Sequence, residues 1–259
     1  MIEQIQKANL FKSLHISGNP LILYNIWDVG GAKALQESGA RAIATSSWSV
    51  AASHGYDDGE KLPFNLVIEN SKRISSNVKL PVTIDLEGGY GKTPTELIKT
   101  VKKIIEAGAI GINFEDQIVG HKILYSIEEQ SKRIKAVRQA AEQTSIPIFM
   151  NARTDLFLMK SDPNETDIEH AICRAAAYAD AGADGFFVPG LKETKHIEKL
   201  CKYSPIPINI MILPTMISLS RLAELGVSRI SYGPSPYHQV MDFLKRAAVS
   251  LHLQHEKIE

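Results

Sequence analysis

The sequence contains little cysteine and has no excess of charge of either sign. Cys173 and Cys201 are the two cysteines among 259 residues, and their spacing matches neither a metal-binding nor a redox pair. Because Cys173 lies in an alanine-rich helical pattern, we expect its thiol to be buried and inert. Basic and acidic residues number 29 each, so the formal net charge is zero, which disfavours a nucleic-acid partner.

Long apolar runs are also absent from the sequence. The most apolar late stretch, residues 205–217, is too short and too interrupted by proline to cross a bilayer. The first 15 residues carry scattered charges and contain no apolar segment of the signal-peptide type. We therefore expect a cytoplasmic protein that has no membrane partner.

Eight short apolar runs alternate with longer segments of helical periodicity, such as 93–108 and 126–143. The candidate N-caps of these two helices are Thr93 or Thr95 and Ser126. The runs have the length of buried strands and occupy residues 21–25, 41–46, 81–85, 110–116, 147–153, 185–190, 207–211 and 229–233. They are preceded in alternation by proline and glycine, namely Pro20, Gly39, Pro81, Gly108, Pro147, Gly182, Pro207 and Gly226. This alternation predicts a (β/α)8 barrel that forms a single domain over residues 1–259, with a doubly wound open sheet as the alternative.

Acidic and amide side chains gather where the predicted strands end. Asp85 and Glu87 close the third run, and Asn113 and Glu115 lie two residues apart in the fourth. Residues two apart on a strand point the same way, so we expect each pair to share a face. Three carboxylates in one pocket repel unless a cation neutralises them, and Mg²⁺ with oxygen ligands is the simplest such cation. The alternative is that these acids cap helices or pair with lysine and arginine.

Arg153 and His121 are the candidate groups for handling a substrate. A planar guanidinium binds a carboxylate through two hydrogen bonds, so Arg153 and a metal together suit a small, doubly anionic 2-oxo acid. The alternative pairs Arg153 with Asp155 or Glu115 inside the protein. His121, in the loop after the fourth run, is placed to supply a proton, unless it is merely solvated. None of the eight runs ends in lysine, which disfavours a Schiff-base aldolase.

Several stretches, taken in order, resemble the isocitrate lyase / phosphoenolpyruvate mutase superfamily from about residue 10 to residue 246. They are SSWSVAASHGYDDGE (46–60), DLEGGYG (85–91), NFEDQ (113–117), NARTD (151–155) and PINIM (207–211). The resemblance implies a Mg²⁺-dependent barrel that binds a small 2-oxo acid or its enolate. The metal then stabilises the charge that develops as a C–C or P–C bond breaks.

The resemblance also implies roles for individual side chains. Asp85 is expected to bind Mg²⁺, with Asp58, Glu87 and Glu115 holding its waters. Substrate oxygens are expected at Ser46, Ser47 and Trp48, a substrate carboxylate at Arg153, and the far wall at Asn209. Together with His121, the expected catalytic groups are Asp58, Glu115 and Arg153. The amphipathic tail, residues 236–259, is expected to exchange between subunits of a homodimer or homotetramer.

The sequence departs from the superfamily's best-known members at the loop after the fourth run. Isocitrate and methylisocitrate lyases carry Cys-Gly-His there, whereas this chain has Val119 before Gly120 and His121. Phosphonomutases use a loop asparagine and a later histidine, but this loop has no asparagine after Gln117, and Pro189 stands near the histidine's place. We therefore expect C–C cleavage of a small 2-oxo or 2-hydroxy di-acid, of the oxaloacetate or 2-alkylmalate lyase type. P–C bond chemistry and a non-catalytic oxo-acid-binding barrel are the alternatives.

Overall fold

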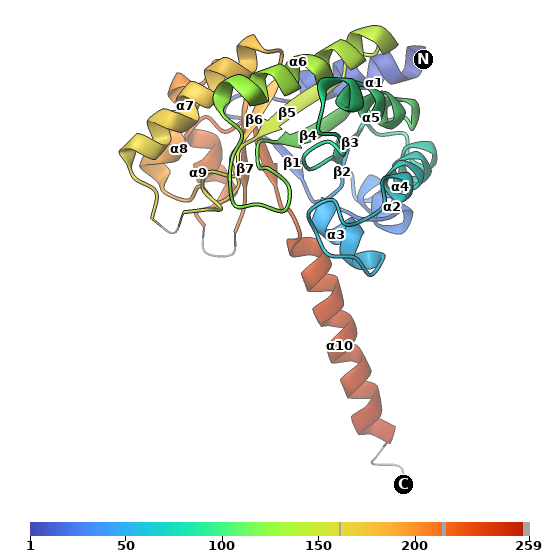
Figure 1. Cartoon of the computed structure of the whole chain (residues 1–259). Coiled ribbons are helices and arrows are strands. Elements are labelled where there is room, and N and C mark those ends of the chain that lie inside the picture. Colours follow the sequence, from blue (N-terminus) through green and yellow to red (C-terminus); the bar gives the residue numbers. More distant parts are fainter. Residues whose placement is uncertain (161, 214–215, 256–259) are drawn as a thin grey trace.

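The computed structural model describes residues 1–160, 162–213 and 216–255, with side chains as far as residue 251. Eight parallel strands surround its centre (Figure 1). They are β1 (Leu21–Leu23), β2 (Ile43–Ala44), β3 (Val82–Asp85), β4 (Gly111–Glu115), β5 (Phe149–Arg153), β6 (Gly185–Phe187), β7 (Ile208–Met211) and β8 (Arg229–Ser231). Each lies within a run predicted as a strand.

The strands form a nearly closed barrel. Hydrogen-bonded neighbours follow the order β1-β8-β7-β6-β5-β4-β3-β2. Beyond the ends of β1 and β2, a further parallel bridge joins Ile26 to Thr45. The Ile26 amide donates to the Ala44 carbonyl at 2.9 Å, and the Ser46 amide donates to the Ile26 carbonyl at 3.1 Å. These contacts confirm the predicted (β/α)8 barrel and show that the open-sheet alternative is wrong.

Helices surround the barrel and cover its amino end (Figure 1). They are α1 (Ile2–Ser13), α2 (Val29–Glu37), α3 (Ser47–Ser53), α4 (Phe64–Asn77), α5 (Pro94–Glu106), α6 (Ile127–Thr144), α7 (Glu165–Asp180), α8 (Thr194–Tyr203), α9 (Leu219–Glu224) and α10 (Ser235–His255). At the amino end of the strands, Phe11 and Leu14 from α1 and its C-cap pack with Leu21 and Phe149 in a small core. At the opposite end of the barrel, α3 follows shortly after β2. A functional site can form at this end.

The local signals in the sequence act as predicted. Thr93 caps α5 and forms a reciprocal capping box with Glu96, and the Ser126 hydroxyl accepts the Glu129 amide at the start of α6. The four glycines expected before the even-numbered strands all have positive φ, between 86° and 108°. Helix ends and strand starts are therefore set by local chemistry.

The expectation that Cys173 is buried is wrong. The buried residues of α7 include Ile168, Ala171, Ala175 and Tyr178, which recur at helical spacing. Cys173 falls between members of this stripe and is exposed. An alanine-rich composition alone does not reveal which side of the helix faces the barrel.

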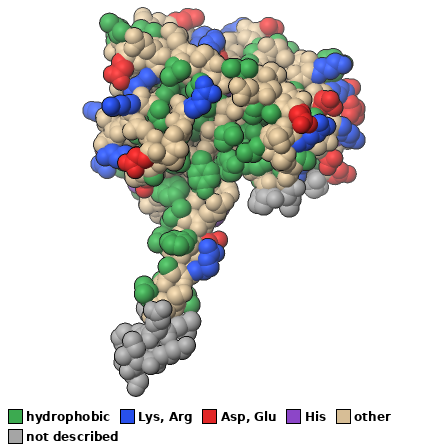
Figure 2. Space-filling view, turned by 180° about the vertical axis from the view of Figure 1, so that it is seen from behind, with side chains coloured by type: hydrophobic (Ala, Val, Ile, Leu, Met, Phe, Trp, Pro, Cys, Tyr) green, Lys and Arg blue, Asp and Glu red, His purple; other side chains and the backbone are tan. Residues whose placement is uncertain are grey.

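Helix α10 projects away from the barrel (Figure 1). Figure 2 shows apolar side chains along it, and Phe243, Leu244 and Leu251 are 61%, 53% and 67% exposed. The predicted tail, 236–259, lies on this helix except for residues 256–259, which are outside the described residues. Among the helices that the structure describes, none is both long and apolar enough to span a membrane.

Candidate active site

A cavity of about 170 Å³ opens at the carboxyl ends of the strands. Six of the residues predicted for the site line it, namely Ser46, Ser47, Trp48, Asp58, Asp85 and Arg153. They come from α3 and its N-cap, from the loop after α3, and from the last residues of β3 and β5. The barrel therefore brings together groups that are more than 100 positions apart in the chain, as the position of a barrel active site requires.

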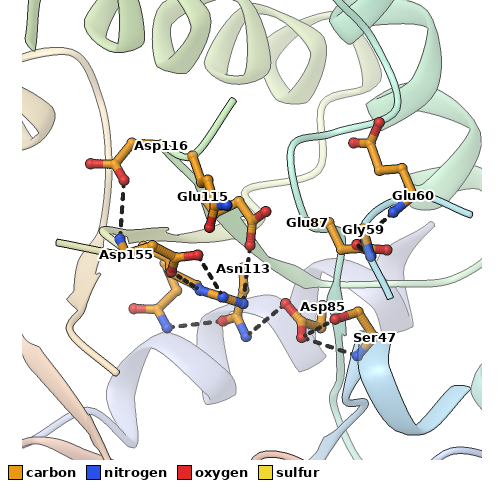
Figure 3. Close-up of polar contacts among 12 residues, drawn as sticks. Ser47, Gly59, Glu60, Asp85, Glu87, Asn113, Glu115, Asp116 and Asp155 are labelled. Atoms are coloured by element: carbon orange, nitrogen blue, oxygen red, sulfur yellow. Dashed lines mark hydrogen bonds and ion pairs between the residues drawn. The ribbon is translucent and has the colours of Figure 1, made fainter. Parts of the chain in front are cut away.

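Asp85 is the most firmly positioned acid of the cavity. Its Oδ2 accepts the Ser47 amide at 3.0 Å and the Ser47 hydroxyl at 2.9 Å, while its Oδ1 accepts the Asn113 side-chain amide at 3.4 Å (Figure 3). The Asp85 amide donates to Thr45 Oγ1 at 2.9 Å. Since Ser47 is the first residue of α3, the carboxylate lies beside the positive end of that short helix.

Asn113 is held from beneath the cavity. Its Oδ1 accepts Asn151 Nδ2 at 2.9 Å and Arg229 Nη2 at 3.2 Å. Arg229 is fully buried, and desolvation lowers the pKa of its guanidinium to about 9, against attraction from Asp85. These contacts orient the Asn113 amide so that it donates to Asp85. The sequence offered no signal for Arg229, because an arginine at the start of a strand is usually exposed.

The extended backbone on which Asp85 and Glu87 were expected to share a face does not continue to Glu87, although both side chains line a small cavity next to α4. Strand β3 ends at Asp85, and Glu87 adopts a left-handed φ of 51°. Its carboxylate accepts the amides of Gly59 and Glu60 at 2.8 and 2.7 Å (Figure 3). Glu87 therefore fastens the loop that carries Asp58 and does not line the cavity of about 170 Å³.

Burial and mutual repulsion make the ionised forms of the acidic side chains around Asp85 unfavourable. Burial, followed by repulsion from Asp85, raises the pKa of Asp58 above its ordinary value. Burial, followed by repulsion from Asp58, raises the pKa of Glu87 to about 7. Burial also raises the pKa of Glu115 well above its usual range, although Arg153 opposes the shift. A divalent cation beside Asp85 relieves this repulsion, so the donor set fits the expected Mg²⁺.

The residues present suit a hydrated Mg²⁺ ion that is held by few protein ligands. Among the described residues, no three aspartate, glutamate, histidine or cysteine side chains are gathered closely enough to hold a metal by themselves. Mg²⁺ commonly keeps several waters and takes one or two carboxylates. Asp85 and Asp58 line the cavity, whereas Glu87 and Glu115 lie behind it.

Arg153 is paired inside the protein. Its Nε and Nη2 donate to the two oxygens of Asp155 at 2.5 and 2.9 Å, and its Nη1 lies 3.1 Å from Glu115 Oε2. The pairing with Asp155 or Glu115 considered from the sequence therefore occurs with both. A guanidinium has five N–H groups, so about two remain for a ligand in the cavity.

A buried network behind Arg153 was missed by the sequence reasoning. The Asp155 amide donates to Asp116 Oδ1 at 3.1 Å, and Asp116 Oδ2 accepts from Arg174 Nη1 and from the Tyr178 hydroxyl, both at 2.9 Å. Arg174 also donates to the Tyr125 carbonyl at 3.1 Å, at the end of the loop after β4. The one sequence feature that pointed to this network was Asp116, the second acid of NFEDQ. Its partners on α7 lie about 60 residues away in the chain, so the sequence did not link them to it.

The glycine-rich loop after β3 is held by another unpredicted arginine. Arg133 of α6 donates to the carbonyls of Gly88, Gly91 and Lys92 at 2.6, 3.3 and 3.4 Å. A Cβ at Gly88 would lie 2.6 Å from a methyl group of Val119, in the loop after β4. The glycines thus let the loops after β3 and β4 pack closely beside the cavity.

Besides Glu87 and Glu115, two further predicted site residues, Asn209 and His121, are not among those that line the cavity. Asn209 is buried beneath it, where its side chain exchanges hydrogen bonds with Ser231, and Ser231 lines the cavity in its place. His121 is exposed in the turn of the loop after β4, where its carbonyl accepts Gln117 Nε2 at 2.7 Å. In this arrangement of the loop, His121 does not reach the groups around Asp85.

Comparison with known proteins agrees with this arrangement. The family model described as phosphoenolpyruvate phosphomutase matches residues 11–252. The chain belongs to this family, within the isocitrate lyase / phosphoenolpyruvate mutase superfamily. The superfamily consists of lyases and mutases, so the chain is an enzyme of that class by descent.

Individual relatives are similar over most of the chain. An uncharacterized protein of Mycobacterium tuberculosis is 33% identical over 88% of this chain and 83% of its own length. The 2-methylisocitrate lyase of Salmonella typhimurium is 29% identical over 76% of this chain and 67% of its own.

Solved structures share the fold. That of a candidate phosphonomutase from Burkholderia cenocepacia J2315 is 43% identical, covers 95% of this chain and 99% of its own, and has a TM-score of 0.93. A phosphonopyruvate hydrolase solved with oxalate and Mg²⁺ has a TM-score of 0.84 at 21% identity, over 96% of this chain and 87% of its own.

Proposed function

We propose that this protein is a Mg²⁺-dependent lyase that cleaves a C–C bond in a small 2-oxo or 2-hydroxy acid. The observation that carries the proposal is Asp85, held by Ser47 and Asn113 at the floor of a cavity beside the amino end of α3. One firmly oriented carboxylate next to backbone and hydroxyl donors suits a ligand that has adjacent oxygens and a hard cation.

Asp85 binds the metal in this proposal, and Asp58 holds one of its waters. A bound Mg²⁺ supplies positive charge, which stabilises the oxyanion that develops when a bond adjacent to the 2-oxo group breaks. The amino end of α3, from Ser46 to Trp48, lines the same cavity beside Asp85. A phosphonopyruvate hydrolase of the same fold was solved with Mg²⁺ and oxalate, which supports the choice of ion.

Asp58 is the proposed proton carrier. Asp58 and Asp85 are the carboxyl groups that line the described part of the cavity, and Asp85 is occupied by donors from Ser47 and Asn113. Burial and the neighbouring Asp85 raise the pKa of Asp58, so Asp58 holds a proton more readily than an exposed aspartate. Arg153 donates its remaining N–H groups to the acid end of the substrate.

P–C bond chemistry is the second candidate. Its support is the 43% identity to a candidate phosphonomutase, which is higher than the 29% identity to 2-methylisocitrate lyase. Against it stand the loop after β4, which lacks an asparagine after Gln117, and Pro189, which lines the cavity near the place of the mutase histidine.

Assembly is part of the proposal. An exposed apolar helix that leaves its own barrel suits exchange between subunits, so we expect α10 to pack against a second copy in a homodimer or homotetramer. Light scattering on the full chain tests this, and a monomer at micromolar concentration would contradict it.

The activity is tested by measuring pyruvate release from 2-oxo and 2-hydroxy acids, beside phosphonopyruvate, with and without Mg²⁺. We expect Mg²⁺-dependent release from a C–C substrate and a loss of at least 100-fold in kcat for Asp58→Asn. Turnover of phosphonopyruvate alone would favour the second candidate. No turnover of any compound, together with intact binding of oxalate, would favour a non-catalytic barrel.

A further inference from the structure

The two halves of the cavity wall differ in chemistry. Strands β3 and β4 and the segment that follows β2 contribute Ser46, Ser47, Asp58, Asp85 and Asn113, which are polar, together with Trp48. The ends of β6 and β7 and the loops after β5, β6 and β8 contribute mainly Leu158, Phe187, Pro189, Met211 and Pro234. Because β2 to β4 lie across the barrel from β6 to β8, the polar groups face an apolar wall.

The polar groups on the apolar side are already satisfied. Ser231 exchanges hydrogen bonds with Asn209 at 3.1 and 3.2 Å. Asn25 Oδ1 accepts the amides of Tyr232 and Gly233 at 2.9 and 3.0 Å, and its Nδ2 donates to the Thr45 carbonyl at 2.8 Å. Ser231 therefore has no donor free for an anionic group of a ligand, and Asn25 has only the second N–H of its amide.

Positive charge is scarce around the cavity as well. Among the lining residues that the structure describes, Arg153 is the one cation. Its charge is balanced by Asp155 and Glu115, which approach three of its nitrogens. A second carboxylate of a substrate, placed against Leu158, Phe187 and Met211, would lose its hydration without gaining a partner, which is costly.

We infer that the substrate is a 2-oxo acid with an uncharged, apolar end, which lies against the wall formed by Leu158, Phe187, Pro189 and Met211. This inference rests on the proposed function, because it takes the oxo-acid head to lie at Asp85 and α3. It changes the substrate class, since the sequence had favoured a di-acid with Arg153 free to bind the second carboxylate.

The inference is tested by titration calorimetry with two ligands of the same shape. In 5-methyl-2-oxohexanoate, an isopropyl group replaces the distal carboxylate of 2-oxoglutarate. With saturating Mg²⁺, we expect the alkyl acid to bind at least tenfold more tightly than 2-oxoglutarate. Along the series pyruvate, 2-oxobutanoate and 2-oxopentanoate, the affinity should rise about 4-fold for each buried methylene. Equal or tighter binding of 2-oxoglutarate would overturn the inference.

Two matched variants test where in the cavity the apolar end of the ligand binds. Leu158 lines the apolar wall and is 49% exposed, while Leu10 is 50% exposed on α1 at the other end of the barrel. Leu158→Arg should reverse the preference and favour 2-oxoglutarate, whereas Leu10→Arg should leave the ratio unchanged. An unchanged ratio in Leu158→Arg would overturn the placement of the apolar end.

Oxalate separates this inference from the proposed function. Oxalate has two adjacent carboxylates and no apolar end, so it occupies only the polar half of the cavity. Oxalate that binds with Mg²⁺ while alkyl acids gain nothing over 2-oxoglutarate would sink the apolar-end inference alone. Absence of oxalate binding would refute the proposed function, and the inference would fall with it.

Discussion

Glu87 is expected to make the metal-free protein less stable as the pH rises. Glu87 is 5% exposed, and the pKa of its carboxyl group is raised from 4.5 to about 7 by burial and by repulsion from Asp58. A raised folded-state pKa contributes stability that is fully present below the unfolded pKa and is lost as the pH rises through the folded one. The affected window therefore runs from about pH 4.5 to about pH 7.

The size of the effect follows from the shift. One pKa unit corresponds to about 1.4 kcal/mol, so a shift of roughly two and a half units is worth at most about 3.5 kcal/mol. Between pH 5.5 and 8.5, the part still to be lost is about 2 kcal/mol. Asp58 and Glu115 also have raised pKa values and add to the trend in the wild-type protein.

The assay is urea unfolding of the metal-free protein at pH 5.5 and 8.5, with Glu87→Gln as the comparison. Glutamine keeps an acceptor for the amides of Gly59 and Glu60 but cannot ionise. We expect the free energy of unfolding to fall less in the variant, by about 2 kcal/mol, over this interval. An equal pH dependence in the two proteins would show that Glu87 is not the buried acid described above.

Two further changes test the supports of the site. Arg174→Met should cost about 3 to 5 kcal/mol in urea unfolding, because it leaves Asp116 buried beside Tyr178 without its cation; a cost below about 1 kcal/mol would contradict this. Gly89→Ala should also destabilise, by more than about 1 kcal/mol, since Gly89 has a φ of 93° and a Cβ there would lie 2.6 Å from a methyl group of Leu97. A thermal melt equal to wild type would refute that assignment.

The barrel could be predicted because its signals are local. A strand, a helix cap and a positive-φ glycine each depend on a few neighbouring residues, and Thr93, Ser126 and Gly108 act as their patterns indicate. Asp85 could be placed as well, because barrel strands end at one face and a carboxylate there faces the cavity. These predictions succeed because strands and helices have regular backbone geometry.

The remaining features of the site depend on contacts between distant segments. Glu87 accepts the amides of Gly59 and Glu60, which lie 28 and 27 residues earlier in the chain. Arg153 had a functional and a structural interpretation, and only the fold shows that Asp155 and Glu115 both reach it. The periodicity of the sequence gives no information about these contacts between distant segments.

The most direct test of the central claim is whether Mg²⁺ and oxalate stabilise the protein together. With both ligands present and oxalate at 100 times its Kd, we expect about 2.7 kcal/mol of added stability, or roughly 5 to 10 °C in Tm. Either ligand alone should give much less, and Asp85→Asn should abolish the joint effect. A joint shift no larger than the separate shifts, or one that persists in Asp85→Asn, would contradict the assignment of Asp85 as the metal ligand.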